Sequence, residues 1–95
     1  MTSKQRAGLR SLANGLDTVM QIGKGGITEA VIQQAEHAIC NKELIKVRVL
    51  ASALLTTREA CETLAQAIGA EPVQCIGSRF VLFRRNEKNP VIPLA

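Results

Sequence analysis

The sequence contains no tryptophan and no tyrosine, and its aromatic side chains are limited to Phe80 and Phe83. Domains of the RRM type bind single-stranded RNA by stacking bases on exposed aromatic rings of a sheet. A stacking platform of that type is therefore not expected in this chain.

Histidine and cysteine are also scarce. The chain has one histidine, His37, and three cysteines, Cys40, Cys61 and Cys75, none of them in a C-x-x-C pair. Zinc sites and disulfide scaffolds usually need paired ligands, and a catalytic thiol needs a nearby base. We therefore expect no metal, no cofactor and no enzyme active site. Cys61 and Cys75 are interpreted as small apolar core residues, and unpaired thiols are typical of the reducing cytoplasm.

Long apolar runs are missing as well. No stretch reaches the ~18 apolar residues that a membrane-spanning helix needs. Residues 1–10 lack the apolar segment of a secretory signal. The sequence therefore predicts a cytoplasmic protein without a membrane partner.

The composition fits one small folded domain. The chain has 95 residues, of which 46% are hydrophobic and 21% are charged, as in globular domains of this length. There are 12 lysine and arginine residues against 8 aspartate and glutamate residues, a net charge of +4. This modest excess favours an acidic partner such as nucleic acid.

The most informative stretch is a glycine-rich loop. A predicted strand, Val19 to Ile22, precedes Gly23-Lys24-Gly25-Gly26, and a predicted helix, Glu29 to Cys40, follows. Glycine allows another backbone to come close, Thr28 can cap the helix, and the helix start attracts anions beside the lysine. The stretch predicts a loop that holds a phosphate backbone, with a plain tight turn as the alternative. The G-x-G-x-x-G and P-loop patterns are both absent.

Two further helices are predicted from apolar residues spaced i, i+3, i+4, i+7. The first begins at a capping box formed by Thr2 and Gln5, and the second at one formed by Thr56 and Glu59. Their expected buried faces are Leu9, Leu12, Ala13 and Leu16 in the first helix and Cys61, Leu64, Ala65 and Ile68 in the second.

Period-two alternation predicts the remaining strands. In the segment Leu44 to Leu50, apolar residues alternate with Lys46 and Arg48. Residues 72–84 read as a hairpin around Gly77-Ser78, a pair that fits a type II′ turn. The expected order is helix, strand, helix, strand, helix, strand, strand. It predicts a single α+β (two-layer α/β) domain with a mixed four-stranded sheet, whose first two strands run parallel.

Several cations could extend a phosphate-binding surface. Lys4, Arg6 and Arg10 lie on the first helix, Lys46 on the polar face of the clearest strand, and Arg84 at the end of the last strand. The alternative for each is a solvated surface side chain.

Four stretches, taken together in this order and spacing, resemble the CRM domain, and in particular its single-domain bacterial form, the YhbY family. They are Ser3 to Ala13, Val19 to Ala30, Glu43 to Val47 and Gln74 to Phe83. The resemblance implies a fold like the C-terminal domain of bacterial translation initiation factor three and a G-x-x-G loop similar to that of KH domains.

The same resemblance implies an RNA-binding protein that acts in assembly of the large ribosomal subunit, with ribosomal RNA as partner. We also expect a monomer that is not an enzyme and has no small-molecule substrate. Carried over, residues 23–26 form the RNA-contacting loop. The first-helix cations Lys4, Arg6 and Arg10 would extend it. The resemblance covers Thr2 to Arg85, so we expect a domain over residues 1–85 and a tail over residues 86–95. One alternative is a protein-interaction adaptor that uses Val81, Phe83 or the apolar tail.

Overall fold

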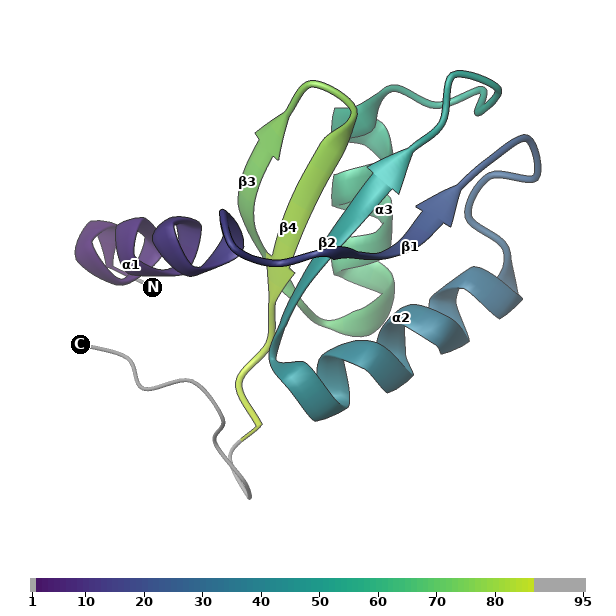
Figure 1. The fold of residues 1–95 in the computed structure, drawn as a ribbon. Helices are drawn as coiled ribbons and strands as arrows, with labels where there is room; N and C mark the ends of the chain where they lie inside the picture. Colours follow the sequence, from purple (N-terminus) through teal and green to yellow (C-terminus); the bar gives the residue numbers. More distant parts are fainter. Residues whose placement is uncertain (1, 87–95) are drawn as a thin grey trace.

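The computed structural model describes residues 2–86 as a four-stranded sheet with three helices packed on it (Figure 1). The elements are α1 (Ser3–Ala13), β1 (Thr18–Ile22), α2 (Glu29–Lys42), β2 (Leu44–Val49), α3 (Thr57–Ile68), β3 (Glu71–Ile76) and β4 (Arg79–Phe83). The strand order is β1-β2-β4-β3, with β1 parallel to β2 and the other pairs antiparallel. The predicted α+β class with a mixed sheet is confirmed. Of the predicted tail, residues 86–95, the structure describes Asn86, and residues 87–95 lie outside the described residues.

The helix ends follow from local hydrogen bonds. Both predicted capping boxes are present: the hydroxyls of Thr2 and Thr56 accept from the amides three residues later, at 3.1 Å each. Helix α3 ends at Gly69 in the left-handed region, with φ +63°, as a glycine stop predicts. In the β3–β4 turn, Gly77 has φ +59°, which fits the first position of a type II′ turn.

The main core lies between one face of the sheet and helices α2 and α3. Alternate residues of β1, β2 and β4 point into it, and Ile22, Ile45, Val47, Phe80 and Leu82 are almost completely buried. Helix α2 contributes Ala35 and Ile39, and α3 contributes Ala60, Cys61, Leu64, Ala65 and Ile68. The predicted alternation of β2 is therefore confirmed, with Lys46 and Arg48 on the other face.

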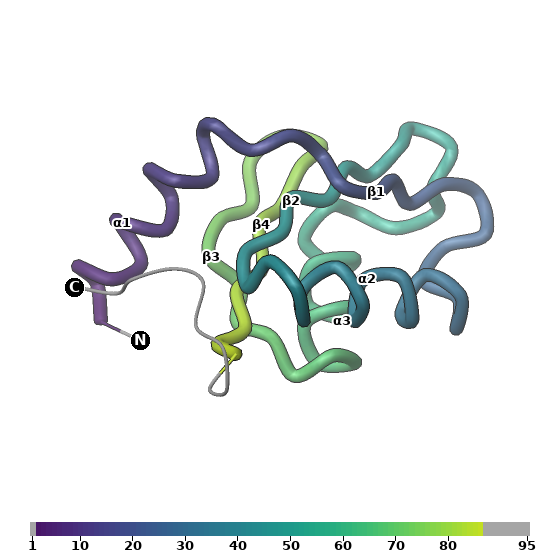
Figure 2. Tube along the Cα trace, turned by 60° about the horizontal axis from the view of Figure 1, so that its bottom comes forward, coloured from purple at the N-terminus to yellow at the C-terminus, as the bar shows by residue number. Residues whose placement is uncertain are grey.

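Helix α1 lies on that other face and covers only part of it (Figure 2). Leu9 and Ala13 pack against a second cluster of strand residues, Leu44, Val73, Val81 and Phe83. Val81 is 2% exposed and Phe83 6% exposed. The suggestion that they offer an exposed docking surface is therefore wrong. Leu12, predicted to face the core, is 50% exposed, and the residues of α1 that pack on the sheet are Leu9 and Ala13.

The cysteines behave differently from one another. Cys61 on α3 is buried, as predicted. Its burial, and to a smaller extent the nearby Cys75, raises the pKa of its thiol from 9.0 to about 11. Cys75 itself is exposed, as is Cys40. The prediction that Cys75 is a core residue is wrong because β3 is an edge strand with a neighbour on one side only.

Candidate nucleic-acid interface

The loop of residues 23–26 is a tight turn at the edge strand β1. The amide of Gly26 donates to the carbonyl of Gly23 at 2.9 Å, and Gly26 adopts φ +71°. Lys24 and Gly25 form the tip of the turn and are exposed. A Cβ on Gly25 would meet only Thr28 Cγ2, at 3.8 Å. Gly26 is therefore the position that needs glycine for its backbone, while a side chain at Gly25 would make one ordinary contact and no clash.

The N-terminus of α2 follows directly. The hydroxyl of Thr28 accepts from the amide of Val31 at 3.2 Å, so the capping role predicted for Thr28 is confirmed. The positive end of the helix dipole and the exposed Lys24 lie next to one another in the chain, and Glu29 supplies one opposing charge in the first turn. The arrangement places a cationic side chain next to the start of a helix.

A second loop, residues 50–56, supports the glycine turn. The amide of Leu50 donates to the carbonyl of Ile22 at 2.9 Å. A Cβ on Gly23 would lie 3.6 Å from the side chain of Leu50, and a Cβ on Gly26 would lie 3.9 Å from the side chain of Leu55. The form of this connection could not be predicted from the sequence, since it depends on which loops meet at this end of the sheet.

The cations of α1 lie at the other end of the molecule from the glycine loop (Figures 1 and 2). Lys4 and Arg10 are exposed, whereas Arg6 is half-buried. The Nε of Arg6 is buried and has no hydrogen-bond partner within residues 2–86. The structure therefore separates these cations from the loop, and the sheet face that carries Lys46 lies between the two.

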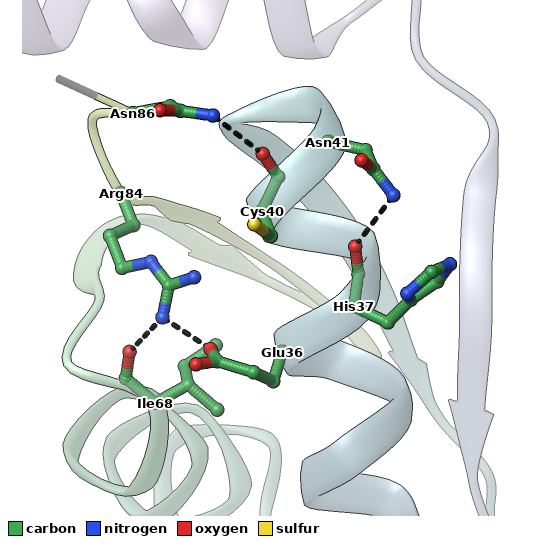
Figure 3. A network of polar contacts seen from close by, with 7 residues as sticks. All are labelled: Glu36, His37, Cys40, Asn41, Ile68, Arg84 and Asn86. Carbon is green, nitrogen blue, oxygen red and sulfur yellow. Dashed lines mark hydrogen bonds and ion pairs between the residues drawn. The ribbon is translucent and has the colours of Figure 1, made fainter. Parts of the chain in front are cut away.

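The side chain of Arg84 binds other residues of the protein (Figure 3). Its guanidinium donates to the carbonyl of Ile68 at 2.8 Å and forms an ion pair with Glu36. It thereby joins the end of β4 to both α2 and α3. This end of β4 is opposite the carboxyl end of β1, because β4 runs antiparallel to β2. The structure does not bring Arg84 to the glycine loop.

Glu43 is a buried carboxylate that sequence reasoning missed. It follows α2 with φ +64° and is completely buried. One carboxylate oxygen accepts from the amide of Asn86 at 2.7 Å and lies 3.9 Å from Nε of Arg85. The side-chain amide of Asn86 also donates to the carbonyl of Cys40 (Figure 3). These contacts fasten the chain after β4 to α2. No sequence pattern signals them, because the partners lie 43 residues apart.

The CRS1/YhbY (CRM) domain model matches residues 1–84 of the chain. The chain belongs to this family. It is 36% identical over 94 residues to the Probable RNA-binding protein YqeI of Bacillus subtilis, covering 99% of this chain and 98% of that protein. It is 34% identical over 88 residues to an RNA-binding protein of Haemophilus influenzae, covering 93% and 89%.

A solved structure agrees with the fold. The solution structure of the hypothetical protein SAV1595 of Staphylococcus aureus, described as a candidate RNA-binding protein, superposes with a TM-score of 0.83 at 45% identity. The match covers 100% of this chain and 99% of that one. None of these relatives is named as an enzyme. Within residues 2–86, no helix has the length and apolar character to cross a bilayer.

Proposed function

We propose that this protein binds RNA without catalysing a reaction, through the domain of residues 1–85, and that the loop Gly23-Lys24-Gly25-Gly26 holds the RNA backbone. The observation that carries the proposal is the exposed turn at the start of α2, where a Cβ on Gly25 would make one ordinary contact, to Thr28 Cγ2. A phosphate can approach such a turn closely and meets Lys24 and the helix N-terminus there. The RNA-binding names of the relatives support the same conclusion.

We place Lys4, Arg6, Arg10 and Lys46 on the extended contact surface, because backbone contacts supply most of the sequence-independent affinity. Thr28 acts by capping the helix that faces the phosphate. A phosphate contact at Arg84 would have to compete with the ion pair that Arg84 forms with Glu36.

The proposed RNA is ribosomal RNA in precursors of the large subunit, bound by a monomer in the cytoplasm. The family resemblance supports the ribosomal assignment. All three cysteines are free, which fits a reducing compartment. The proposal involves no cofactor.

Crosslinking in cells tests this assignment. Ultraviolet crosslinking, purification of the protein and sequencing of the attached RNA should return large-subunit ribosomal RNA above its share in total RNA. Gradient sedimentation of the lysate should place the protein with large-subunit precursors. Recovery of unrelated transcripts, with the protein at the top of a low-salt gradient, would refute the ribosomal role but leave RNA binding itself standing.

A further inference from the structure

The half of the sheet that α1 leaves uncovered carries a row of exposed side chains that crosses all the strands. The register places Gln21 opposite Arg48, Arg48 opposite Arg79, and Arg79 opposite Ile76. All four residues are exposed, and Ile76 is 64% exposed although it is a large apolar residue. The row therefore forms a cationic centre with a polar end at β1 and an apolar end at β3.

The two arginines face one another without a counter-charge. Directly opposed like charges on neighbouring strands destabilise a sheet. Within residues 2–86, neither Arg48 nor Arg79 forms a side-chain hydrogen bond or ion pair. An anion between them would remove this repulsion, and no carboxylate within residues 2–86 forms an ion pair with either arginine.

A hollow lies next to this row. It has a volume of about 170 Å³ and is lined by Asn14, Lys46, Gln74, Ile76, Arg79 and Val81. None of these lining residues is a carboxylate. The amide side chains and Lys46 offer hydrogen-bond donors and acceptors at the wall, while Val81 and Ile76 offer apolar surface. This mixture matches the edge and face of a nucleobase more closely than it matches a bare phosphate.

The row and the hollow together connect the two ends of the proposed interface. Asn14, which lines the hollow, is the C-cap of α1. Gln21, at the β1 end of the row, immediately precedes Ile22 and the glycine loop. An RNA strand that contacts both the loop and α1 would therefore pass over Arg48 and Arg79.

We propose that this open half of the sheet is a second RNA-binding surface that takes unpaired nucleotides, with phosphates between Arg48 and Arg79 and a base in the adjoining hollow. The inference rests on the proposed function, since the ligand is the same RNA. Unpaired bases can turn toward the protein, whereas the base edges and faces of a duplex are occupied. Because the only phenylalanines, Phe80 and Phe83, are buried, the base packs on the guanidinium plane of Arg79 and on Ile76.

The test uses fluorescently labelled oligouridine, either free or annealed to oligoadenosine. The double variant Arg48→Gln/Arg79→Gln should bind the free strand about ten-fold more weakly and flatten the log-affinity against log-salt slope by about one to two units. The affinity of the double variant for the duplex should fall much less. Arg79→Lys keeps the charge but loses the planar stacking group, so it should keep the salt slope and still bind the free strand more weakly.

The matched control is Arg58→Gln, which removes one positive charge from the opposite side of the sheet, where Arg58 is 84% exposed on α3. It should change affinity little. Wild-type affinity and slope in the folded double variant would overturn the inference, as would an equal loss on free strand and duplex. If Gly25→Asp weakens RNA binding and the double variant does not, the proposed function stands and the second surface is rejected. If the double variant weakens RNA binding and Gly25→Asp does not, the loop is rejected as an RNA-binding site.

Discussion

Gly25→Asp separates a phosphate-binding loop from a plain turn. Gly25 lies at the exposed tip, and the left-handed backbone of this turn is at Gly26, with φ +71°. A Cβ at Gly25 would make one ordinary contact, to Thr28 Cγ2 at 3.8 Å. An exposed substitution of this kind changes the free energy of unfolding by about 0.5 kcal/mol. A carboxylate near the helix N-terminus stabilises by a similar amount. The melting temperature should therefore stay within a few degrees of wild type.

The expected effect on binding is much larger. Two like charges about 4 Å apart repel by ~1 kcal/mol in bulk water and by ~4 kcal/mol at an effective dielectric constant of about 20. The exposed loop lies between these limits, and ~1.4 kcal/mol corresponds to ten-fold in affinity. We therefore expect Gly25→Asp to bind RNA at least about ten-fold more weakly. The RNA affinity of Lys24→Ala should lie between those of the wild type and Gly25→Asp, and its log-affinity against log-salt slope should be flatter by about one unit.

A melting curve and a filter-binding titration on the same preparations measure both effects. Gln66→Glu adds a negative charge on the exposed side of α3 and should leave affinity near the wild-type value. Gly26→Ala should instead lower stability by about 1 kcal/mol, because it places a side chain at positive φ. Wild-type affinity in a folded Gly25→Asp protein would refute the reasoning and return the loop to a plain turn.

Three further predictions concern other parts of the molecule. Replacing Arg6 and Arg10 together by alanine should flatten the salt slope by about one to two units, and an unchanged slope would make them ordinary surface residues. Arg84→Ala should lower the free energy of unfolding by about 1–2 kcal/mol and leave RNA affinity unchanged. Glu36→Gln should lower the free energy of unfolding by a smaller amount. A loss of RNA affinity in folded Arg84→Ala would support the phosphate contact predicted from the sequence. Because the pKa of Cys61 rises from 9.0 to about 11 on folding, stability should fall between pH 9 and pH 11 by up to ~1.4 kcal/mol per pH unit. Denaturant titrations of Cys61→Ala should lack that dependence, and an identical pH slope would disprove it.

Local rules in the sequence were sufficient to predict the elements. Capping at Thr2 and Thr56 depends on a partner three residues away. Period-two alternation in β2 separates its two faces whatever strand lies beside it. The stop at Gly69 needs only a residue that tolerates positive φ. For the same reason, the glycine loop and the cap at Thr28 were predictable, because both lie within one short stretch of chain.

Only the tertiary structure decided where these elements meet. Sequence alternation placed Lys46 and Arg48 on one face, but the pairing of β2 with β4 placed Arg79 opposite Arg48. Helix α1 packs on Val81 and Phe83 and leaves that row exposed. The burial of Glu43 and the ion pair of Arg84 likewise depend on residues more than 40 positions apart. Such contacts carry no local signal, because they arise from the order of strands in the sheet and not from the spacing of residues along the chain.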